Sequence, residues 1–269
     1  MPELPEVEIT MRGIAGLVGQ AVRSVTIRHP QLRWPIPAEL PTTLPQLTLH
    51  SLERRAKYIL ANFDTGTLIL HLGMSGRICL LPQFEAAQKH DHFDIQFNHG
   101  QVLRLRDPRR FGAILWASQA SQHPLIVSLG PEPLDDNFNG DYLHKSIRTR
   151  SAAIKTTIMD SHLVVGVGNI YASESLFRAR INPNTPANKL SKARCAQLVE
   201  EIKATLIDAI LAGGSSLRDF FGADGNPGYF QQAYFVYGRT GQACKICQTP
   251  IKQIKQGQRS TFYCPNCQK

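Results

Sequence analysis

The sequence predicts a multidomain α+β protein with a strand-rich N-terminal half, a helical segment after it and a small cysteine module after that. Short apolar runs separated by turn residues dominate up to about residue 118, which is the pattern of an antiparallel sandwich or barrel. Four cysteines in two close pairs come last. Between these parts an apolar stripe has helical spacing, at Cys195, Leu198, Val199, Ile202, Leu206 and Ile210.

The size, composition and charge of the chain limit its class. Its 269 residues, 42% of them apolar, suit a globular protein of two domains with a small added module. No apolar run approaches the ~18 residues of a membrane span, and the first residues lack a basic and then apolar signal, so we expect a cytoplasmic protein without a membrane partner. The net charge of +9 suits ribosomal, membrane-surface and DNA-binding proteins. After Asp224 there are cations but no Asp or Glu, which favours a nucleic-acid partner.

Nucleophilic chemistry is expected at the first residues. Pro2 is small, so we expect Met1 to be removed, which leaves Pro2 with a secondary α-amine. An α-amine titrates near ~8, well below the ~10.4 of lysine, and is therefore a ready nucleophile at neutral pH. Its attack on an aldehyde-level carbon gives an iminium ion, which is an electron sink for elimination reactions. Glu3 lies beside it and could give or take a proton.

The alternative for this stretch is an acidic cap on an ordinary helix. Pro5 suits a first helical turn, and Glu6 and Glu8 suit the positive end of the helix dipole. The apolar residues that follow keep helical spacing, and two glycines are expected to end the helix: Val7, Met11 and Ile14, then Gly16 and Gly19.

Strands are expected from about residue 22 to residue 118. The clearest runs are 58–63, 67–71, 95–97, 102–105 and 113–116, with turn residues at 64–66, 98–100 and 107–108 between them. Turn residues at 130–133 and 135–140 then form a linker to the helical segment. The apolar stripe of that segment ends at Gly213 and Gly214.

The two cysteine pairs, Cys244-x2-Cys247 and Cys264-x2-Cys267, are spaced as in a zinc ribbon, where four thiolates hold one Zn²⁺. The alternative is two disulfides, which a cytosolic chain disfavours. Four cysteine ligands close the coordination sphere, so we expect a structural zinc. Residues 248–263 would project as a basic hairpin that carries Arg259, for which the alternative is a solvated surface cation.

A glycine-paired turn within residues 163–171 precedes a predicted helix. Gly166 and Gly168 in such a turn expose backbone N–H groups at a helix dipole end, which is a phosphate site, and Asn169 can add a side-chain donor. The motif is weak alone, because Gly-x-Gly often marks only a tight turn.

Two further segments, 73–76 and 107–112, each place a large side chain between turn residues at a strand end. Met74 and Phe111 are apolar wedges, and Arg109 is a cation with a planar fork. Proteins that open DNA insert such wedges into the base stack. The alternative for Met74 and Phe111 is core packing, and for Lys57, in Arg54-Arg-Ala-Lys57, an ordinary surface lysine.

Taken together, these segments resemble the formamidopyrimidine-DNA glycosylase family, bacterial enzymes that repair oxidised purines. The resemblance implies a DNA glycosylase and abasic-site lyase that removes 8-oxoguanine and formamidopyrimidines from duplex DNA and cleaves the strand by β,δ-elimination. Its motifs run in order along essentially the whole chain: residues 1–7, Arg55-Ala-Lys-Tyr58, His71-Leu-Gly-Met-Ser-Gly76, Lys89-His-Asp-His92, Asp107-Pro-Arg-Arg-Phe-Gly112, Val165-Gly-Val-Gly-Asn-Ile-Tyr-Ala-Ser-Glu174, Asp224-Gly-Asn-Pro-Gly228 and the four cysteines.

The resemblance also implies roles for the residues at matching positions. Pro2 would form the Schiff base at C1′ of the damaged nucleotide, and Glu3 would exchange a proton with the sugar. Lys57 would assist the first elimination and Arg259 the second. Lysine is common in the family at position 150, and a phosphate contact survives the change to arginine. The implied DNA-binding residues are His90, Arg109, Arg150 and Asn169 at phosphates, Lys155 and His71 near the site, and Met74, Arg109 and Phe111 in the hole left by the everted base.

The fold implied by the resemblance has three parts, with damaged duplex DNA in the cleft between them. These are an N-terminal antiparallel β-sandwich at 1–130, a helix–two-turn–helix domain at 131–225 and a zinc-ribbon finger at 235–269. Residues 215–229 resemble a loop that covers the everted base. We expect a monomer with no cofactor beyond one structural zinc.

Two alternatives remain open. Endonuclease VIII belongs to a sister family of the same architecture that prefers oxidised pyrimidines, but that family usually has glycine where this chain has Leu4. The set of Met74, Arg109 and Phe111 also favours the purine enzymes. A zinc-ribbon DNA-binding protein without catalysis would explain the charge and the cysteines, but it would leave the Pro2-Glu3 pair unexplained.

Overall fold

The computed structural model describes residues 2–215 and 228–269. Its contacts divide the chain into two compact units, one made of residues 1–127 and 212–229 and the other of residues 128–211 and 230–269. The cysteine module therefore belongs to the same unit as the helices, and residues 212–215 and 228–229 belong to the same unit as the strands. In the described ranges, we find no helix that is long and apolar enough to cross a bilayer.

The first unit begins with helix α1 (Leu4–Gly13), followed by a single 3₁₀ turn, η1 (Ala15–Leu17). The prediction that Gly16 and Gly19 end the helix was wrong, because α1 ends at Gly13. Glycine has a low helix propensity, so the first glycine that the chain meets stops the helix. The backbone N–H of Ile14 then donates to the carbonyl of Met11, 3.2 Å away, and this bond tightens the last turn.

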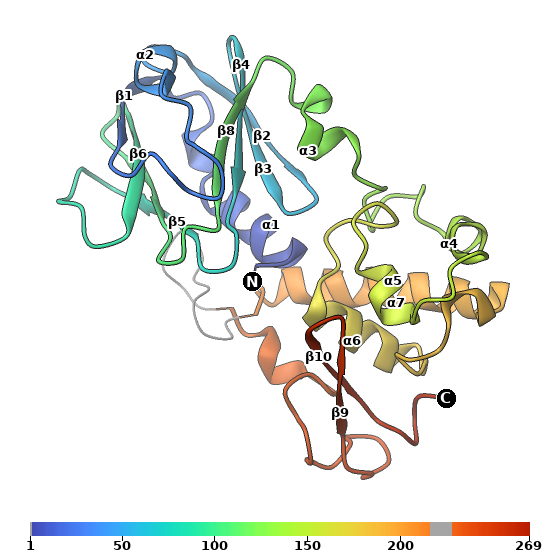
Figure 1. Cartoon of the computed structure of the whole chain (residues 1–269). Coiled ribbons are helices and arrows are strands. Elements are labelled where there is room, and N and C mark those ends of the chain that lie inside the picture. Colours follow the sequence, from blue (N-terminus) through green and yellow to red (C-terminus); the bar gives the residue numbers. More distant parts are fainter. Residues whose placement is uncertain (1, 216–227) are drawn as a thin grey trace. The chain divides into compact units, whose positions relative to one another are not determined.

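Two four-stranded antiparallel sheets follow, drawn blue to green in Figure 1, and they confirm the predicted β-sandwich. Their facing apolar residues form one core, which includes Ile59 and Leu70 from one sheet and Phe93 and Leu103 from the other. The first sheet has the order β1 (Val22–Ile27), β6 (Asp91–Phe97), β7 (Val102–Arg106) and β5 (Arg77–Leu81). The second has the order β2 (Leu49–Arg55), β3 (Tyr58–Phe63), β4 (Gly66–His71) and β8 (Ala113–Ala117). Three short helical turns complete this unit: α2 (Leu40–Thr43), η2 (Ala120–Gln122) and α3 (Pro124–Val127).

The strand register brings several loops to one end of the sandwich. In the second sheet Tyr58 pairs with His71, and His71 pairs with Ala113. In the first sheet Arg106 pairs with both Arg77 and Asp91. The turn before β3, the β4–β5 loop, the end of the β5–β6 loop and the β7–β8 loop therefore share this end, which holds the predicted residues of this unit from Lys57 onward.

A buried ion network stiffens the first sheet beside that end. Arg104 donates two hydrogen bonds to Asp94, of 2.8 and 2.7 Å, and lies 3.3 Å from Asp91. It also donates to the carbonyls of Glu85 and Ala86 in the β5–β6 loop. Burial raises the pKa of Asp94, but the hydrogen bonds from Arg104 and Arg28 outweigh it and hold that pKa below its usual value. The network thus joins strands β6 and β7 to the β5–β6 loop at Glu85 and Ala86.

The second unit is helical and ends in a two-stranded hairpin. Its helices are α4 (Gly140–Ile147), α5 (Ile154–Ile158), α6 (Asn169–Arg178) and α7 (Lys192–Leu211), with 3₁₀ turns η3 (Ala187–Lys189) and η4 (Phe230–Ala233). The apolar stripe predicted for α7 is buried against α4 and α6. Strands β9 (Lys252–Gln256) and β10 (Arg259–Tyr263) form the hairpin, red in Figure 1, and β10 lies beside α6.

Candidate functional site

The β4–β5 and β7–β8 loops pack back to back and leave their large side chains exposed. Met74 is 40% exposed and Phe111 is 44% exposed, so neither is a core residue. Gly73 has a φ of +61°, and a Cβ added to it would lie 2.3 Å from the carbonyl carbon of Phe111, so only glycine allows this approach. The guanidinium of Arg109 lies 4.7 Å from the centre of the Phe111 ring. The two loops therefore present one cationic and two apolar side chains together.

Lys57 and His71 lie beside these loops. Lys57 follows Ala56, which has a φ of +55°, in the tight turn between β2 and β3. Burial, together with the positive charges of Lys57 and Arg33, lowers the pKa of His71 to about 4. His71 is therefore neutral at pH 7. Its Nδ1 accepts the N–H of Gly73, 3.1 Å away, so its proton is on Nε2, which can donate.

The first residues form the acidic helix cap that the sequence also suggested, with Glu3 as the N-cap and Glu6 in the first turn. A cap of this kind is compatible with a nucleophilic amine at Pro2. Pro2 and Glu3 are buried directly before α1. The carboxylate of Glu6 accepts the backbone N–H of Glu3 and, through its other oxygen, that of Ser215, each at 2.8 Å. Met1 and residues 216–227, which include most of the predicted covering loop, lie outside the described residues.

His90 adopts a strained backbone conformation at the same end of the sandwich. Its φ is +75°, and its carbonyl accepts the N–H of Asp107, 3.0 Å away. The next residue, Asp91, caps this turn by accepting the N–H of Gln88 at 2.8 Å. The imidazole of His90 lies 6.2 Å from that of His92.

In the second unit, the structure brings Lys155 and Asn169 together in the interior. The side chain of Lys155 is only 1% exposed, and its ammonium donates to Asn169 Oδ1 at 2.6 Å, to Thr261 Oγ1 at 2.7 Å and to the Ser260 carbonyl at 3.2 Å. The amide of Asn169 donates to the same carbonyl at 3.0 Å. This network ties strand β10, which begins at Arg259, to helices α5 and α6.

Asn169 is the first residue of α6, as the glycine-paired turn predicted. Gly166 has a φ of +80°, and Gly168 is the N-cap of α6. Arg150 lies at 2.7 Å from Asp160, which neutralises part of its charge. Burial raises the pKa of Asp160, but the hydrogen bonds from Arg150 and from the backbone N–H of His162, together with the charge of Arg150, outweigh it and keep that pKa below its usual value.

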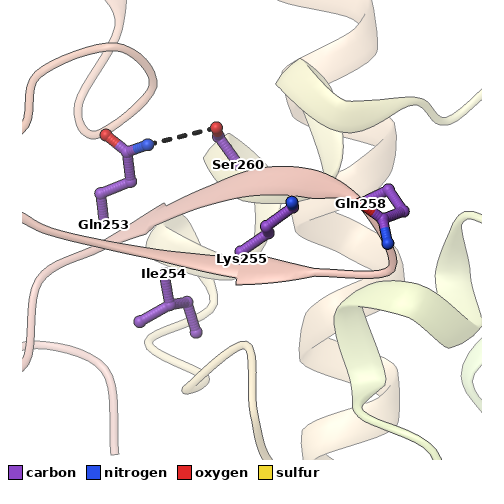
Figure 2. Close-up of a pocket in the computed structure, with 5 residues that line it drawn as sticks. All are labelled: Gln253, Ile254, Lys255, Gln258 and Ser260. Carbon is purple, nitrogen blue, oxygen red and sulfur yellow. Dashed lines mark hydrogen bonds between the residues drawn. The ribbon is translucent and has the colours of Figure 1, made fainter.

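The hairpin carries a shallow polar pocket next to Arg259. Figure 2 shows its lining residues on β9, β10 and the turn between them: Gln253, Ile254, Lys255, Gln258 and Ser260. Gln253 and Ser260 meet across the strands through a 3.2 Å hydrogen bond. A polar surface with Lys255 and an exposed Arg259 suits a sugar-phosphate backbone.

The four predicted cysteine ligands converge on one point. Their Sγ atoms all lie within 4.8 Å of one another, with 3.9 Å between those of Cys244 and Cys267 and 3.4 Å between those of Cys247 and Cys264. A tetrahedral zinc with Zn–S bonds of ~2.3 Å separates its sulfurs by about 3.8 Å, so the cluster fits one zinc ion. All four are free thiols rather than disulfides. They would hold one structural Zn²⁺.

Two residues of these networks were not predicted to have a role of their own. The sequence analysis named Asp107 only as a turn residue and as the start of a family motif, although its side chain bonds to both exposed loops. Glu174 is buried, and its carboxylate accepts the N–H groups of Phe235, Val236 and Tyr237 at the entrance to the zinc ribbon. Its position among apolar residues in the sequence of α6 is the signal from which a buried carboxylate could have been predicted.

Comparison with known proteins gives the same family along the whole chain. Residues 1–114 match the model of the formamidopyrimidine-DNA glycosylase N-terminal domain, residues 129–221 that of its H2TH domain, and residues 241–269 that of a zinc finger found in FPG and IleRS. The chain is similar to the formamidopyrimidine-DNA glycosylase of Methylobacillus flagellatus, with 65% identity over 100% of this chain and 97% of the relative.

Solved structures of a more distant relative share the fold. One is the complex of a Lactococcus lactis FPG mutant with DNA that contains Fapy-dG, at a TM-score of 0.92, 34% identity and full coverage of both chains. Another is the complex of Lactococcus lactis Fpg with DNA that contains an abasic site, at a TM-score of 0.92 and 33% identity over 99% of each chain.

Proposed function

The chain belongs to the formamidopyrimidine-DNA glycosylase family, and we propose that it excises oxidised purines from duplex DNA and then cleaves the strand at the resulting abasic site. The observation that carries this proposal is the likeness, over the full chain, to structures solved with Fapy-dG and abasic-site DNA. We further propose that the protein acts as a monomer in the cytoplasm, with residues 1–130, 131–225 and 235–269 as its three functional segments.

The chemistry starts at the N-terminal amine. The nitrogen of Pro2 attacks C1′, the bond from C1′ to the base breaks, and the base leaves with that electron pair and takes up the proton that the Pro2 nitrogen gives up. Glu3 protonates the ring oxygen as the bond from C1′ to O4′ breaks, so an iminium ion remains. The iminium ion acidifies the hydrogen on C2′, which allows the 3′-phosphate to leave and then the 5′-phosphate. Lys57 assists the first departure and Arg259 the second.

The remaining residues hold DNA. We propose that His90, Arg109, Arg150 and Asn169 contact phosphates, a role that the net charge of +9 supports. Met74 and Phe111 fill the hole that the everted base leaves, together with Arg109. The neutral His71 can donate from Nε2 near Lys57. Lys155 acts from the interior, through Asn169 and the strand that begins with Arg259.

A trapping experiment tests the nucleophile. Incubating the protein with abasic-site DNA and borohydride should give one covalent protein–DNA adduct, because borohydride reduces the iminium ion. Blocking the Pro2 amine with an N-terminal extension, or changing Pro2→Gly, should reduce the adduct strongly. A zinc-ribbon protein without catalysis would give no adduct, and full trapping by the extended protein would exclude Pro2 as the nucleophile.

A lesion panel tests the substrate class. We expect faster excision of 8-oxoguanine and formamidopyrimidine lesions than of oxidised pyrimidines from the same duplex sequence. Glu3→Gln should slow base excision more than cleavage of a pre-formed abasic site, because proton transfer matters most while the base is attached. Preference for oxidised pyrimidines would instead favour an activity like that of endonuclease VIII.

A further inference from the structure

Asp107 lies directly after β7, beneath the two exposed loops, and its side chain is fully buried. Its Oδ1 accepts the hydroxyl of Ser75 at 2.8 Å and the backbone N–H of Arg109 at 3.3 Å. Its Oδ2 accepts the backbone N–H of Gly112 at 2.8 Å. One carboxylate therefore holds the β4–β5 loop and both halves of the β7–β8 loop.

The main chain of Asp107 extends the same set of contacts to a third loop. Its N–H donates to the carbonyl of His90 at 3.0 Å. Its carbonyl accepts Nε2 of His92 at 2.9 Å and the N–H of Arg110 at 3.2 Å. Oδ1, the N–H and the carbonyl of this residue thus connect segments that are far apart in sequence, and Oδ2 holds its own loop.

The donors to Asp107 lie at or next to the side chains proposed to enter the DNA. Ser75 follows Met74, Gly112 follows Phe111, and the N–H of Arg109 is held directly. The carboxylate therefore fixes the backbone on which each exposed side chain stands. An exposed side chain has few packing contacts of its own, so its direction depends on its anchored backbone.

An ordinary turn does not explain this arrangement. Aspartate before proline commonly starts a turn by accepting an N–H two residues later, and the bond from Arg109 is of that kind. The bonds from Ser75 and Gly112 and the contacts with His90 and His92 are additional, and most of them come from other loops.

We propose that Asp107 is a positioning residue for duplex opening, which sets Met74, Arg109 and Phe111 in one geometry before DNA arrives. This inference rests on the proposed function. The buried carboxylate does not touch DNA and takes no part in bond cleavage. It makes the three side chains act as one wedge.

The test is Asp107→Asn, which keeps the shape of the side chain but replaces one carboxylate oxygen with an NH2 donor. That donor faces either the N–H of Gly112 or the hydroxyl of Ser75 and the N–H of Arg109, so at least one of these hydrogen bonds is lost. Ser75→Ala removes only the link to the β4–β5 loop. Asp94→Asn is the matched control, since Asp94 is equally a buried carboxylate of this unit but bonds to Arg28 and Arg104 instead. Excision is measured on duplex DNA with 2-aminopurine next to the lesion, whose fluorescence rises when the stack opens.

For Asp107→Asn we expect at least an approximately tenfold loss of duplex excision, together with loss of the fluorescence rise, because hydrogen bonds to a buried charge are strong. Trapping on single-stranded abasic DNA should fall much less. Phe111→Ala should cost little more in the Asp107→Asn background than that variant alone, since both remove the same wedge. Ser75→Ala should show a smaller loss of the same kind.

Three outcomes would overturn the inference. Normal duplex excision by Asp107→Asn is the first, and additive losses in the double variant are the second. The third is an equal fall of duplex and single-strand activities in Asp107→Asn and Asp94→Asn, which would make Asp107 a stability residue only. Failure of the wild-type protein to trap or excise would instead refute the proposed function.

Discussion

The β-sandwich and the zinc ribbon hold their proposed DNA-facing residues with buried charges of opposite sign. In the sandwich, the carboxylate of Asp107 accepts N–H and O–H groups from two loops. In the second unit, the ammonium of Lys155 donates to oxygens of Asn169, Ser260 and Thr261. The loops of the sandwich point N–H and O–H donors at Asp107, which an anionic carboxylate accepts. Strand β10 and Asn169 point oxygen acceptors at Lys155, to which a cationic ammonium donates.

The two regions differ further in how much apolar surface they bury. The sandwich core runs through both sheets and α1, whereas the core around the ribbon is small and includes two of the proposed zinc ligands: Phe177, Val236, Cys244, Ile251, Phe262 and Cys264. A module with so little core depends on its metal for folding. The comparison therefore predicts that loss of zinc unfolds the ribbon and leaves the sandwich folded.

Removal of zinc should have the largest effect and should affect one region only. Chelation or Cys244→Ser should unfold the ribbon, since structural zinc contributes ~10 kcal/mol or more to such folds. Both tryptophans of the sequence, Trp34 and Trp116, lie in the first unit, so their fluorescence transition should hardly change. Zinc content and DNA affinity should fall together, whereas Arg259→Ala should keep its zinc. Full DNA binding after chelation would contradict this view of the ribbon.

Loss of the buried ammonium should come next. Lys155→Met removes the ammonium donor from the oxygens of Asn169 and Thr261 and leaves the Ser260 carbonyl with the Asn169 amide alone, and we expect a loss of about 3 kcal/mol in the second unit. Hydrogen exchange of β10 amides would report it. Lys192→Met is the control, because the ammonium of Lys192 pairs with Asp141 at an exposed site and should matter little. Unchanged exchange in β10 would show that Lys155 does not anchor this strand.

The sandwich should lose stability in acid through His71. Its folded pKa of about 4 lies below the ordinary value of 6.5, so the unfolded chain takes up a proton first as the pH falls. The free energy of unfolding therefore keeps its full value, as far as His71 is concerned, above pH 6.5. It falls as the pH drops from 6.5 to about 4. By pH 5 this fall should amount to about 2 kcal/mol, measured by denaturant unfolding with tryptophan fluorescence. His71→Gln should lose this part of the pH dependence, whereas the exposed His99→Gln should retain it.

Truncation of the wedge should have the smallest effect on stability. Met74→Ala and Phe111→Ala remove exposed side chains, so unfolding should shift by no more than ~0.5 kcal/mol. Duplex excision should fall, but the slope of log affinity against log salt should stay the same, because neither residue is charged. Arg109→Ala should reduce that slope by up to ~1. Wild-type duplex excision by both apolar variants would refute the wedge.

The sequence predicted those parts that depend on local pattern. Alternating apolar runs gave the strands, the stripe gave α7, and the cysteine spacing gave the metal site. The position of α1's end was missed because a glycine inside an apolar pattern can be tolerated or can stop a helix. The anchoring roles of Asp107 and Lys155 were not predicted, for a different reason. Asp107 and Lys155 act through residues far away in the chain, and a lysine that will be buried looks in sequence like any other lysine.

The residue type at position 73 is constrained by folding, whereas that at position 74 is constrained by function. A side chain at position 73 would collide with the backbone at Phe111, so the fold itself forbids drift there. The side chains of Met74 and Phe111 are exposed, so the part of the chain that the structure describes opposes their replacement only weakly. In a descendant released from selection for repair, we therefore expect the glycine to persist while the two exposed side chains diversify, which would make their identity a record of function rather than of folding.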